Sequence, residues 1–507
     1  MRLAESASRR VLLAPLLGAA SVAAFAPVGW FPLAWLTLGG LCLLLGPSAD
    51  RRGSVREGAL LGWLFGLGFF LTGVSWIFVS LSTFGGMSAP VAGLATLFFC
   101  AAMALYPALA GALFARLAPP TGWRRALVFA ALWTLAEWLR GWLLTGFPWL
   151  AVGYSQTPRS PLAGFAPIVG VYGVSLLTAF AGACLVESGG IPRGGRRAVR
   201  PSLAGITLAA IILLGGIALS GRAWTTPQGR PLSVALLQGN IAQDDKWRPE
   251  KLEESLLAYY SLMRDHPARL TVLPEAALPM FLADVPQDYL DALSQLAARQ
   301  DGEILFGVVT GDWSRYANSV VGLGASGTQR YDKSHLVPFG EFVPPGFAWF
   351  MDLAYIPMSG FTPGGERQAP FLVDGRRIAV NICYEDAFGE EIIRALPQAE
   401  LLLNVSNMAW FGDSLAPAQH LQIARMRALE TGRMVLSATN TGITAIIGAD
   451  GIVRATLPSY TRAALTGQVT AHIGATPFAR WGNGPAVILC FLLPGLAWRR
   501  RVPSGGT

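Results

Sequence analysis

One cysteine stands apart from the other four in a position suited to nucleophilic catalysis. Cys383 ends the apolar run 378–382, and the polar residues 384–386 follow at once. A nucleophile at the end of a strand, where the chain turns into a helix, is exposed by the turn, and we expect the helix to lower the thiol pKa. The alternative is a buried, inert thiol. The remaining cysteines fall within long apolar segments: Cys42, Cys100, Cys184 and Cys490.

Two charged residues at the ends of other predicted strands could assist a thiol at Cys383. Glu275 follows the run 270–274, and Lys333 follows 329–332 and opens a long loop. A carboxylate could take the thiol proton, and a lysine could stabilise both the thiolate and the oxyanion of a tetrahedral intermediate. Alone, each would be a solvated surface charge. Three strand ends in one layer predict an acyl-transfer site, and the histidines have less suggestive neighbours: His266, His335, His420 and His472.

The residues that must position this site, 222–483, alternate between β-rich runs and polar helical segments. Pro249 suits the first turn of a helix, and Asp-Gly pairs at 374–375 and 450–451 predict hairpins. This alternation predicts an α/β layered sandwich. The predicted strands are 233–237, 270–273, 303–309, 319–323, 371–373, 377–382, 401–405, 434–438, 444–447 and 452–456, and the predicted helices are 249–265, 287–300 and 415–431.

The composition is that of a membrane protein with a soluble part. Hydrophobic residues make up 52% of the 507 residues and charged residues 14%, where about a quarter charged is usual in soluble chains. The apolar content excludes a disordered chain, and five cysteines are too few for a disulfide-built module. Apolar runs close to the roughly 20 residues of a spanning helix predict eight spans, at about 11–26, 31–46, 58–80, 89–115, 126–144, 162–186, 202–220 and 484–498.

Arginine marks alternate loops between these spans. The chain has 36 arginines and only 3 lysines, and the arginines gather before span one, in loops 47–57, 116–125 and 187–201, and in the tail. Cytoplasmic loops carry this excess, which predicts cytoplasmic termini and places 222–483 on the periplasmic side of a bacterial inner membrane. The charge flanks spans and forms no single stripe, which argues against nucleic-acid binding. Residues 9–26 also resemble a signal peptide, whose cleavage would not change this orientation.

Two charged residues lie inside the fifth predicted span. Glu137 and Arg140 are three residues apart, on one helix face. A charge within a membrane is a functional hypothesis by default. The alternative, which we favour, is a buried pair that orients the helix bundle, because such a pair neutralises itself.

The motifs around these residues resemble a known family. Glu275 in LPEAAL, Lys333 in YDKSHLVPFGEF and Cys383 in NICYEDAF resemble the triad of the nitrilase superfamily of carbon–nitrogen hydrolases. AEWLRGWLLTGFPWLAVGYSQ at 136–156 resembles the bacterial apolipoprotein N-acyltransferases, as do LLQGNIAQDDKW, NVSNMAWFGDS and RMRALETGRMVLSATNTGIT. The resemblance covers essentially the whole chain. It implies a transmembrane domain over 1–221, a periplasmic nitrilase-like αββα sandwich over 222–483, and a last span and cytoplasmic tail over 484–507.

The resemblance implies a ping-pong acyl transfer. Cys383 would attack an ester carbonyl of a membrane phospholipid and form a thioester. The α-amino group of a diacylglyceryl-modified N-terminal cysteine on an apolipoprotein would then accept the acyl chain. Glu275 would be the general base, and Lys333 with a backbone N–H near Tyr384 would form the oxyanion hole. No metal-ligand spacing or phosphate-binding glycine loop is visible, so no cofactor or metal is expected.

Four further residues match positions that the family uses. Glu341 matches a carboxylate that helps to position the triad, Tyr384 and Glu385 adjoin the nucleophile, and Trp247 matches a tryptophan that meets substrate. The alternatives are a surface charge for Glu341 and an aromatic packed under a loop for Trp247. One departure is visible at Met408, where family members often carry aspartate. It puts a local contact in doubt and leaves the chemistry unchanged.

The long loop 334–369 is rich in Pro, Gly and aromatic residues, which is typical of a binding loop or lid. Its part 342–361 is too apolar for a free loop in water. We expect it either to dip into the outer leaflet and gate entry or to pack on its own domain. Two other functions stay open: a membrane-tethered amidase or nitrilase, in which water replaces the amine, and a transporter or lipid-binding protein, in which Cys383 is dispensable.

Overall fold

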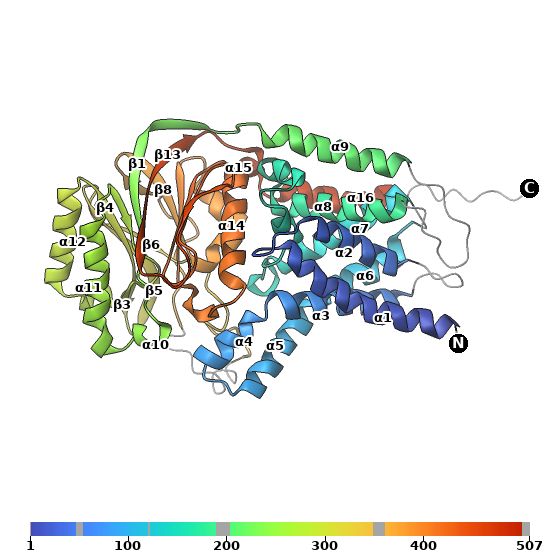
Figure 1. Cartoon of the computed structure of the whole chain (residues 1–507), viewed down its shortest axis with the longest axis horizontal. Helices are drawn as coiled ribbons and strands as arrows, with labels where there is room; N and C mark the ends of the chain where they lie inside the picture. Colours follow the sequence, from blue (N-terminus) through green and yellow to red (C-terminus); the bar gives the residue numbers. More distant parts are fainter. Residues whose placement is uncertain (1, 47–53, 120–121, 189–202, 348–359, 499–507) are drawn as a thin grey trace, which may run out of the picture. The chain divides into compact units, whose positions relative to one another are not determined.

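The computed structural model describes residues 2–46, 54–119, 122–188, 203–347 and 360–498, and these fall into two units (Figure 1). The first unit comprises Met1–Ser75, Gly93–Arg222 and Trp481–Thr507, and the second comprises Trp76–Ala92 and Ala223–Arg480. The first is helical and the second contains both β-sheets.

Helices occupy all eight segments that were predicted to span a membrane. In the described residues, four helical stretches are long and apolar enough to cross one: Val55–Gly73, Ala89–Leu117, Pro161–Glu187 and Leu203–Ser220. Two others are apolar but shorter, α2 and α16. The helices are α1 (Arg2–Ser21), α2 (Pro32–Leu44), α3 (Val55–Gly73), α5 (Ala89–Met103), α6 (Leu105–Leu117), α7 (Trp123–Arg140), α8 (Ala166–Ser188), α9 (Leu203–Ser220) and α16 (Gly484–Trp498).

Glycine allows two of these helices to approach closely. A Cβ at Gly111 on α6 would lie 2.2 Å from the backbone oxygen of Gly58 on α3, and a Cβ at Gly62 would lie 2.2 Å from that of Pro107. Without a hydrophobic force between helices in lipid, small residues that permit this approach are the usual means of association.

The third predicted span, 58–80, was placed too far along the chain. Helix α3 ends at Gly73, and Trp76–Ala92 belongs to the second unit. There α4 (Trp76–Val79) and the π-helix η2 (Ser80–Phe84) pack on the 3₁₀ helix η10 (Met408–Phe411). The Trp76 ring lies 4.7 Å from that of Phe411, and the Ser80 hydroxyl donates to the Trp410 carbonyl at 2.8 Å. An apolar segment that covers a protein surface resembles a span in sequence, because both bury apolar side chains.

The second unit is built on two β-sheets. One has the order β13-β1-β2-β4-β5-β6, with β3 also paired to β4, and the other has the order β12-β11-β10-β9-β8-β7. The strands are β1 (Thr226–Gln238), β2 (Leu270–Val272), β3 (Leu278–Phe281), β4 (Glu303–Asp312), β5 (Arg315–Gly324), β6 (Gln329–Asp332), β7 (Phe371–Val373), β8 (Arg376–Ile382), β9 (Leu401–Ser406), β10 (Val435–Thr439), β11 (Ala445–Ile447), β12 (Val453–Thr456) and β13 (Ala463–Ile473).

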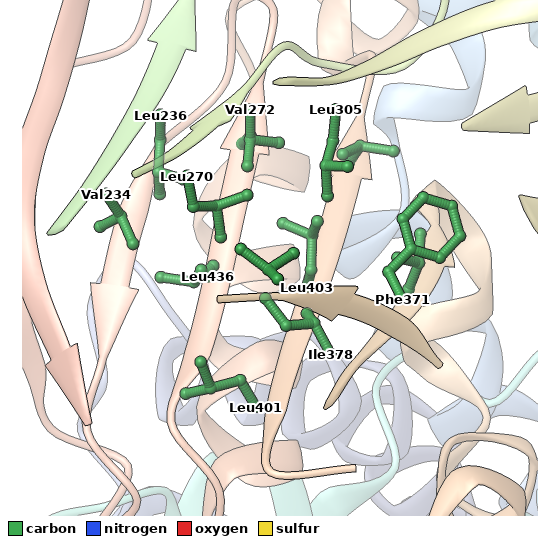
Figure 2. Close-up of a cluster of buried hydrophobic side chains, with 14 of the residues drawn as sticks. Val234, Leu236, Leu270, Val272, Leu305, Phe371, Ile378, Leu401, Leu403 and Leu436 are labelled. Carbon is green, nitrogen blue, oxygen red and sulfur yellow. The ribbon is translucent and has the colours of Figure 1, made fainter. Parts of the chain in front are cut away.

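Alternate side chains of the strands form the core between the two sheets (Figure 2). Val234 and Leu236 of β1, Leu436 of β10 and Leu403 of β9 belong to this cluster. The residues between them point to the opposite faces, such as Ala235 toward the helices of the first sheet. Both faces of the sheets are therefore apolar at their centres, which explains why inner strands such as β4 and β9 are near-continuous hydrophobic runs.

Helices cover the two outer faces and complete an α–β–β–α sandwich. Helices α11 (Pro249–Asp265) and α12 (Gln287–Arg299) pack on the first sheet through Tyr259, Met263 and Leu293, and α14 (Ala416–Thr431) packs on the second through Ala424 and Ala428 (Figure 1). This confirms the predicted αββα fold. Strands β3 and β13 were not predicted.

Candidate active site

Cys383 lies where β8 ends and the 3₁₀ helix η8 (Cys383–Ala387) begins. Its φ angle is +54°, in the left-handed region that non-glycine residues rarely adopt. The Cys383 carbonyl accepts a hydrogen bond from Asn404 Nδ2 at 3.1 Å. A strained turn that its surroundings hold in place is common at catalytic nucleophiles. The thiol is half-buried.

The structure brings Glu275 and Lys333 to this turn, together with Glu341. The expectation that the three strand ends lie in one layer was wrong: Glu275 and Lys333 come after β2 and β6 of the first sheet, whereas Cys383 follows β8 of the second. Lys333 Nζ lies 2.9 Å from Glu341 Oε1 and 3.5 Å from Glu275 Oε1. The Lys333 side chain is 1% exposed, so these carboxylates are the charges that compensate it. The Cys383 thiol forms a side-chain hydrogen bond with Glu275. A thiol, two carboxylates and an ammonium thus share one buried site.

One asparagine side chain and two backbone N–H groups hold the carboxylates in place. Asn318 on β5 donates from Nδ2 to both Glu275 Oε1, at 2.8 Å, and Glu341 Oε1, at 3.0 Å. The backbone N–H of Asn407 donates to Glu275 Oε2 at 2.8 Å, and that of Val337 donates to Glu341 Oε2 at 2.8 Å. Each carboxylate therefore has a fixed orientation, as a base that must meet a thiol requires.

The protein raises the pKa of the Cys383 thiol, which corrects the expectation from the sequence. Burial contributes most, the charge of Glu275 adds to it, and Lys333 opposes it. The helix that follows has only five residues, in 3₁₀ geometry. Desolvation and carboxylates therefore outweigh its dipole. Cys383 is therefore a protonated thiol at rest, and a nucleophilic role would require a base to take its proton.

The charges of the site keep Glu275 and Lys333 ionised. Burial alone would raise the pKa of Glu275, but Lys333 and the hydrogen bond from Asn318 lower it below its ordinary value. Burial alone would lower the pKa of Lys333, but Glu341 and Glu275 raise it above its ordinary value. At neutral pH the site therefore holds a carboxylate that can accept a proton and an ammonium that can stabilise an oxyanion.

Glu385 forms hydrogen bonds with both the turn at Cys383 and the loop that follows Lys333. Its Oε1 accepts from the N–H groups of Ser334 at 2.6 Å and His335 at 3.0 Å, and its Oε2 accepts from the N–H of Ile382 at 2.7 Å and the Tyr331 hydroxyl at 3.0 Å. Burial raises the Glu385 pKa to about 6, against these hydrogen bonds. Glu385 thus fixes the position of the Cys383 turn relative to the loop that follows Lys333.

The remaining predicted residues lie around this centre. Tyr384 is half-buried, and its ring lies 5.0 Å from that of Phe388. Trp247, 36% exposed, follows the short helix α10 (Gln243–Lys246). Met408 is buried and packs against Gly442, where a Cβ would lie 2.9 Å from its Cγ. The departure at Met408 is therefore an apolar packing contact.

Sequence reasoning missed several polar groups that complete the site. Asn318 lies in an apolar strand, and a polar residue in such a run is itself a signal. Lys246 is 3% exposed, and its Nζ donates to the Glu275 carbonyl at 3.0 Å. His420 Nε2 lies 3.4 Å from the Cys383 carbonyl, and burial lowers the His420 pKa to about 4. His420 is therefore neutral and does not act as the cationic partner of the thiol.

Two sequence expectations fall at the edge of what the structure describes. Residues 348–359, most of the apolar loop expected to gate entry, lie outside the described residues, as do much of loops 47–57 and 187–201 and the arginines of the tail. In the described part of that loop, the Phe347 ring lies 5.4 Å from that of Phe339.

Within the described ranges, no three His, Cys, Asp or Glu side chains gather as metal ligands.

Comparison with known proteins accounts for both halves of the chain. Residues 17–184 match the apolipoprotein N-acyltransferase N-terminal domain, and residues 233–478 match the carbon–nitrogen hydrolase family. A solved structure with a lower similarity is a carbon–nitrogen hydrolase superfamily protein from Xanthomonas campestris, 20% identical, with a TM-score of 0.38 over 51% of this chain and 97% of that chain.

Curated relatives extend the match to nearly the full length. The apolipoprotein N-acyltransferase of Nitrosomonas europaea is 47% identical over 96% of both chains, and that of Ralstonia nicotianae is 46% identical over 96% of this chain and 93% of the relative. Identity at this level over both the helical and the sandwich unit leaves one assignment: the chain belongs to the apolipoprotein N-acyltransferase family of bacterial membrane enzymes.

Proposed function

We propose that this N-acyltransferase moves an acyl chain from a membrane phospholipid, through a thioester on Cys383, to the α-amino group of a diacylglyceryl-cysteine at the N-terminus of an apolipoprotein. The observation that carries the proposal is the juxtaposition of a half-buried thiol with an ionised carboxylate and an ionised lysine, Glu275 and Lys333. The names of the curated relatives support the transfer reaction and argue against a transporter.

In the first half-reaction, Glu275 takes the proton of the Cys383 thiol as the sulfur attacks the ester carbonyl of the phospholipid. Lys333 Nζ and the backbone N–H of Tyr384 stabilise the oxyanion of the tetrahedral intermediate. When the intermediate collapses, the C–O bond breaks and the alkoxide takes the proton back from Glu275. The products are an acyl thioester and a lysophospholipid.

In the second half-reaction, the amine attacks the thioester carbonyl and Glu275 takes a proton from its nitrogen. The C–S bond breaks, the sulfur leaves and regains a proton, and the product is an amide on a triacylated lipoprotein. Glu341 and Glu385 act by position: Glu341 holds Lys333 at 2.9 Å, and Glu385 joins the two turns. We assign Tyr384 and Trp247 to the contact surface for substrate.

The donor must be a lipid that stays in the bilayer during the reaction. Each CH₂ exposed to water costs roughly 0.8 kcal/mol, so acyl chains do not leave a membrane cheaply. We propose that 222–483 is the catalytic domain, on the periplasmic side, between a transmembrane domain of residues 1–221 and a last span in 484–507. The alternation of arginine-rich loops supports this orientation and the cytoplasmic placement of both termini.

A membrane-tethered amidase would use the same three residues, with water in place of the amine. The purified chain is incubated with phospholipid labelled in its acyl chain and a diacylglyceryl-cysteine peptide, and the control is the same peptide with an acetylated α-amine. With the free amine we expect labelled amide and repeated turnover to lysophospholipid, and with the acetylated peptide at most the single equivalent of lysophospholipid that accompanies the thioester. Free labelled fatty acid formed equally with both peptides would contradict the proposal and identify a hydrolase.

A further inference from the structure

A second buried lysine lies behind the proposed catalytic base. Lys246 ends α10, its side chain is 3% exposed, and its Nζ donates to the backbone carbonyl of Glu275 at 3.0 Å. The mechanism above assigns it no role. Lysine is among the residues least often buried without a charged partner, so its place here needs an explanation.

Composition makes the position more notable. The chain contains 36 arginines and only three lysines, Lys246, Lys251 and Lys333. The Lys251 side chain is 45% exposed on α11 and pairs with Glu254 at 2.9 Å. The other two are both buried at the candidate site. An ammonium is compact and can lose its proton when buried, whereas a guanidinium stays charged. In a chain that otherwise uses arginine, lysine is thus concentrated at the reacting centre.

A network of side-chain amides holds α10 against the site. Asn407 donates from Nδ2 to Gln243 Oε1 at 2.8 Å, and its backbone N–H contacts the Glu275 carboxylate. Asn440 donates from Nδ2 to both Asn407 Oδ1, at 3.1 Å, and the Ile241 carbonyl, at 2.8 Å. These residues belong to the motifs QGNIAQDDKW, NVSN and TNTG. Their shared effect is to fix Lys246 and the Glu275 carboxylate relative to each other.

We propose that Lys246 is a positioning residue whose ammonium charge keeps the Glu275–Cys383 pair at a single shared proton. The proposal rests on the proposed role of Cys383 as the nucleophile. With Lys246 charged, two ammoniums balance the two carboxylates of the buried cluster. Without that charge, the cluster carries a net negative charge in a poorly solvated site, and it binds a second proton. Glu275 is then protonated and cannot act as the base.

The electrostatic surroundings agree with this role. The charge of Lys246 lowers the pKa of Glu275, and burial lowers the pKa of Lys246 itself to about 8, against the opposing charges of Glu275 and Cys383. Burying an ammonium costs free energy of desolvation. We therefore expect the charge of Lys246 itself to have a role. The titratable groups that face this cluster from the packed elements are Glu275, Lys333, Glu341, Cys383 and His420.

The test measures how fast Cys383 reacts with iodoacetamide as a function of pH, by mass spectrometry of the Cys383 peptide. Lys246→Gln removes the charge but can still donate to the Glu275 carbonyl, and Lys246→Met removes both. Lys251→Met is the matched control. We expect the acidic limb of the profile to move up by about one pH unit or more in both Lys246 variants, that is, about tenfold slower alkylation at a fixed acidic pH. The control should superimpose on the wild type.

A Lys246→Gln profile that superimposes on the wild type would overturn the inference and leave Lys246 a structural residue. If Lys246→Gln does not fold, Lys246→Arg decides. Lys246→Arg keeps a positive charge over the whole pH range of the assay, so its alkylation profile should lie close to that of the wild type. A Lys246→Arg profile displaced upward by about one pH unit, as expected for Lys246→Met, would overturn the inference. Alkylation by iodoacetamide involves no lipid, so it tests Lys246 separately from the proposed function. If the alkylation profile shifts in the Lys246 variants but the wild type never forms an acyl thioester on Cys383, the proposed function is refuted and the role of Lys246 stands.

Discussion

Both units of the molecule bury acidic and basic side chains, but they satisfy them differently. In the helical unit, Glu137 Oε1 accepts from Trp133 Nε1 and the Val152 N–H, both at 2.9 Å, and Arg140 donates to the Phe147 and Trp149 carbonyls, the latter at 2.5 Å. In the sandwich unit, the carboxylates of Glu275 and Glu341 contact Lys333, and Glu275 contacts a thiol.

The difference separates two uses of buried charge. The Glu137 and Arg140 side chains hold the backbone of 147–152, a segment without regular α-helix, so their partners cannot exchange protons with them. This agrees with the interpretation that the pair orients the bundle. The charges at Cys383 are bound to one another, so a proton can move among them. Groups that perturb each other's pKa in this way mark functional sites.

The largest expected effect comes from removing the nucleophile. Cys383→Ala should reduce acyl transfer by about 10⁴-fold or more, because no thioester can form. The thermal unfolding temperature should stay near that of the wild type, since the side chain is half-buried and small. Transfer to the diacylglyceryl peptide and unfolding are measured on the same preparation. Substantial residual transfer would place the nucleophile elsewhere.

Removing the cation should have the next largest effect. Lys333→Met should lower kcat by about 10²- to 10³-fold, the usual loss for a group that stabilises an oxyanion. Lys333→Arg, the matched control for charge, should not restore the rate, because a guanidinium cannot take the place of a compact ammonium that is 1% exposed. Full rescue by arginine would show that only the charge matters.

Glu341 tests whether a carboxylate outside the reacting trio acts by position. Glu341→Gln removes the charge that holds Lys333 and keeps the side-chain shape. We expect kcat to fall by about 10- to 100-fold, as is usual for groups that orient a reacting residue, with KM for phospholipid little changed. A change confined to KM would instead assign Glu341 to substrate binding.

Asp386 offers a third kind of buried acid. Both of its carboxylate oxygens lack a hydrogen-bond partner in the described part of the chain, and burial raises the Asp386 pKa to about 7, against the charge of Arg427. The Asp386 pKa in the folded chain lies above its value of about 4 in the unfolded chain. The resulting contribution to the free energy of unfolding is fully present below pH 4 and is lost as the pH rises through 7, by at most about 1.4 kcal/mol per pH unit. Compared with Asp386→Asn, the wild type should therefore lose apparent unfolding temperature between pH 4 and 7. Parallel curves would contradict this.

The smallest effect on catalysis is expected in the helical unit. Glu137→Gln weakens hydrogen bonds to Trp133 and Val152 and should destabilise the fold by about 1–3 kcal/mol. The transfer rate per folded molecule should be unchanged. If the transfer rate per folded molecule falls while the unfolding temperature stays unchanged, Glu137 has a role in catalysis and the contrast between the two units is contradicted.

Local patterns predicted most of the elements, and non-local pairing explains the failures. Helix α11 has the predicted bounds 249–265, because Pro249 marks its start. Strand β13 was missed: its sequence AALTGQVTAHI is short of large apolar residues, and its place depends on pairing with β1, from Gln238↔Ala463 to Thr226↔Ile473. No local window contains that partner. The same reason explains why the third span was extended beyond Gly73.

The site shows the same limit. Cys383, Glu275 and Lys333 could be singled out because each follows a strand-like run, and the structure brings them together. Lys246 sits among charged neighbours in QDDKW, which is typical of a solvated helix end, yet the tertiary fold buries it against Glu275. The direction of the Cys383 pKa was wrong for a related reason. The sequence indicates a helix after the thiol, but it does not show how much water the surrounding carboxylates and apolar groups exclude.

The most direct test is to trap the acyl-enzyme. The purified chain is incubated with phospholipid labelled in its acyl chain, without an amine acceptor, and digested without reductant. We predict that the Cys383 peptide carries the acyl group as a hydroxylamine-labile adduct, absent in Cys383→Ser and discharged by the diacylglyceryl peptide. If Cys383 is alkylated readily by iodoacetamide but never acquires the acyl group, the central claim of a thioester on this residue is contradicted.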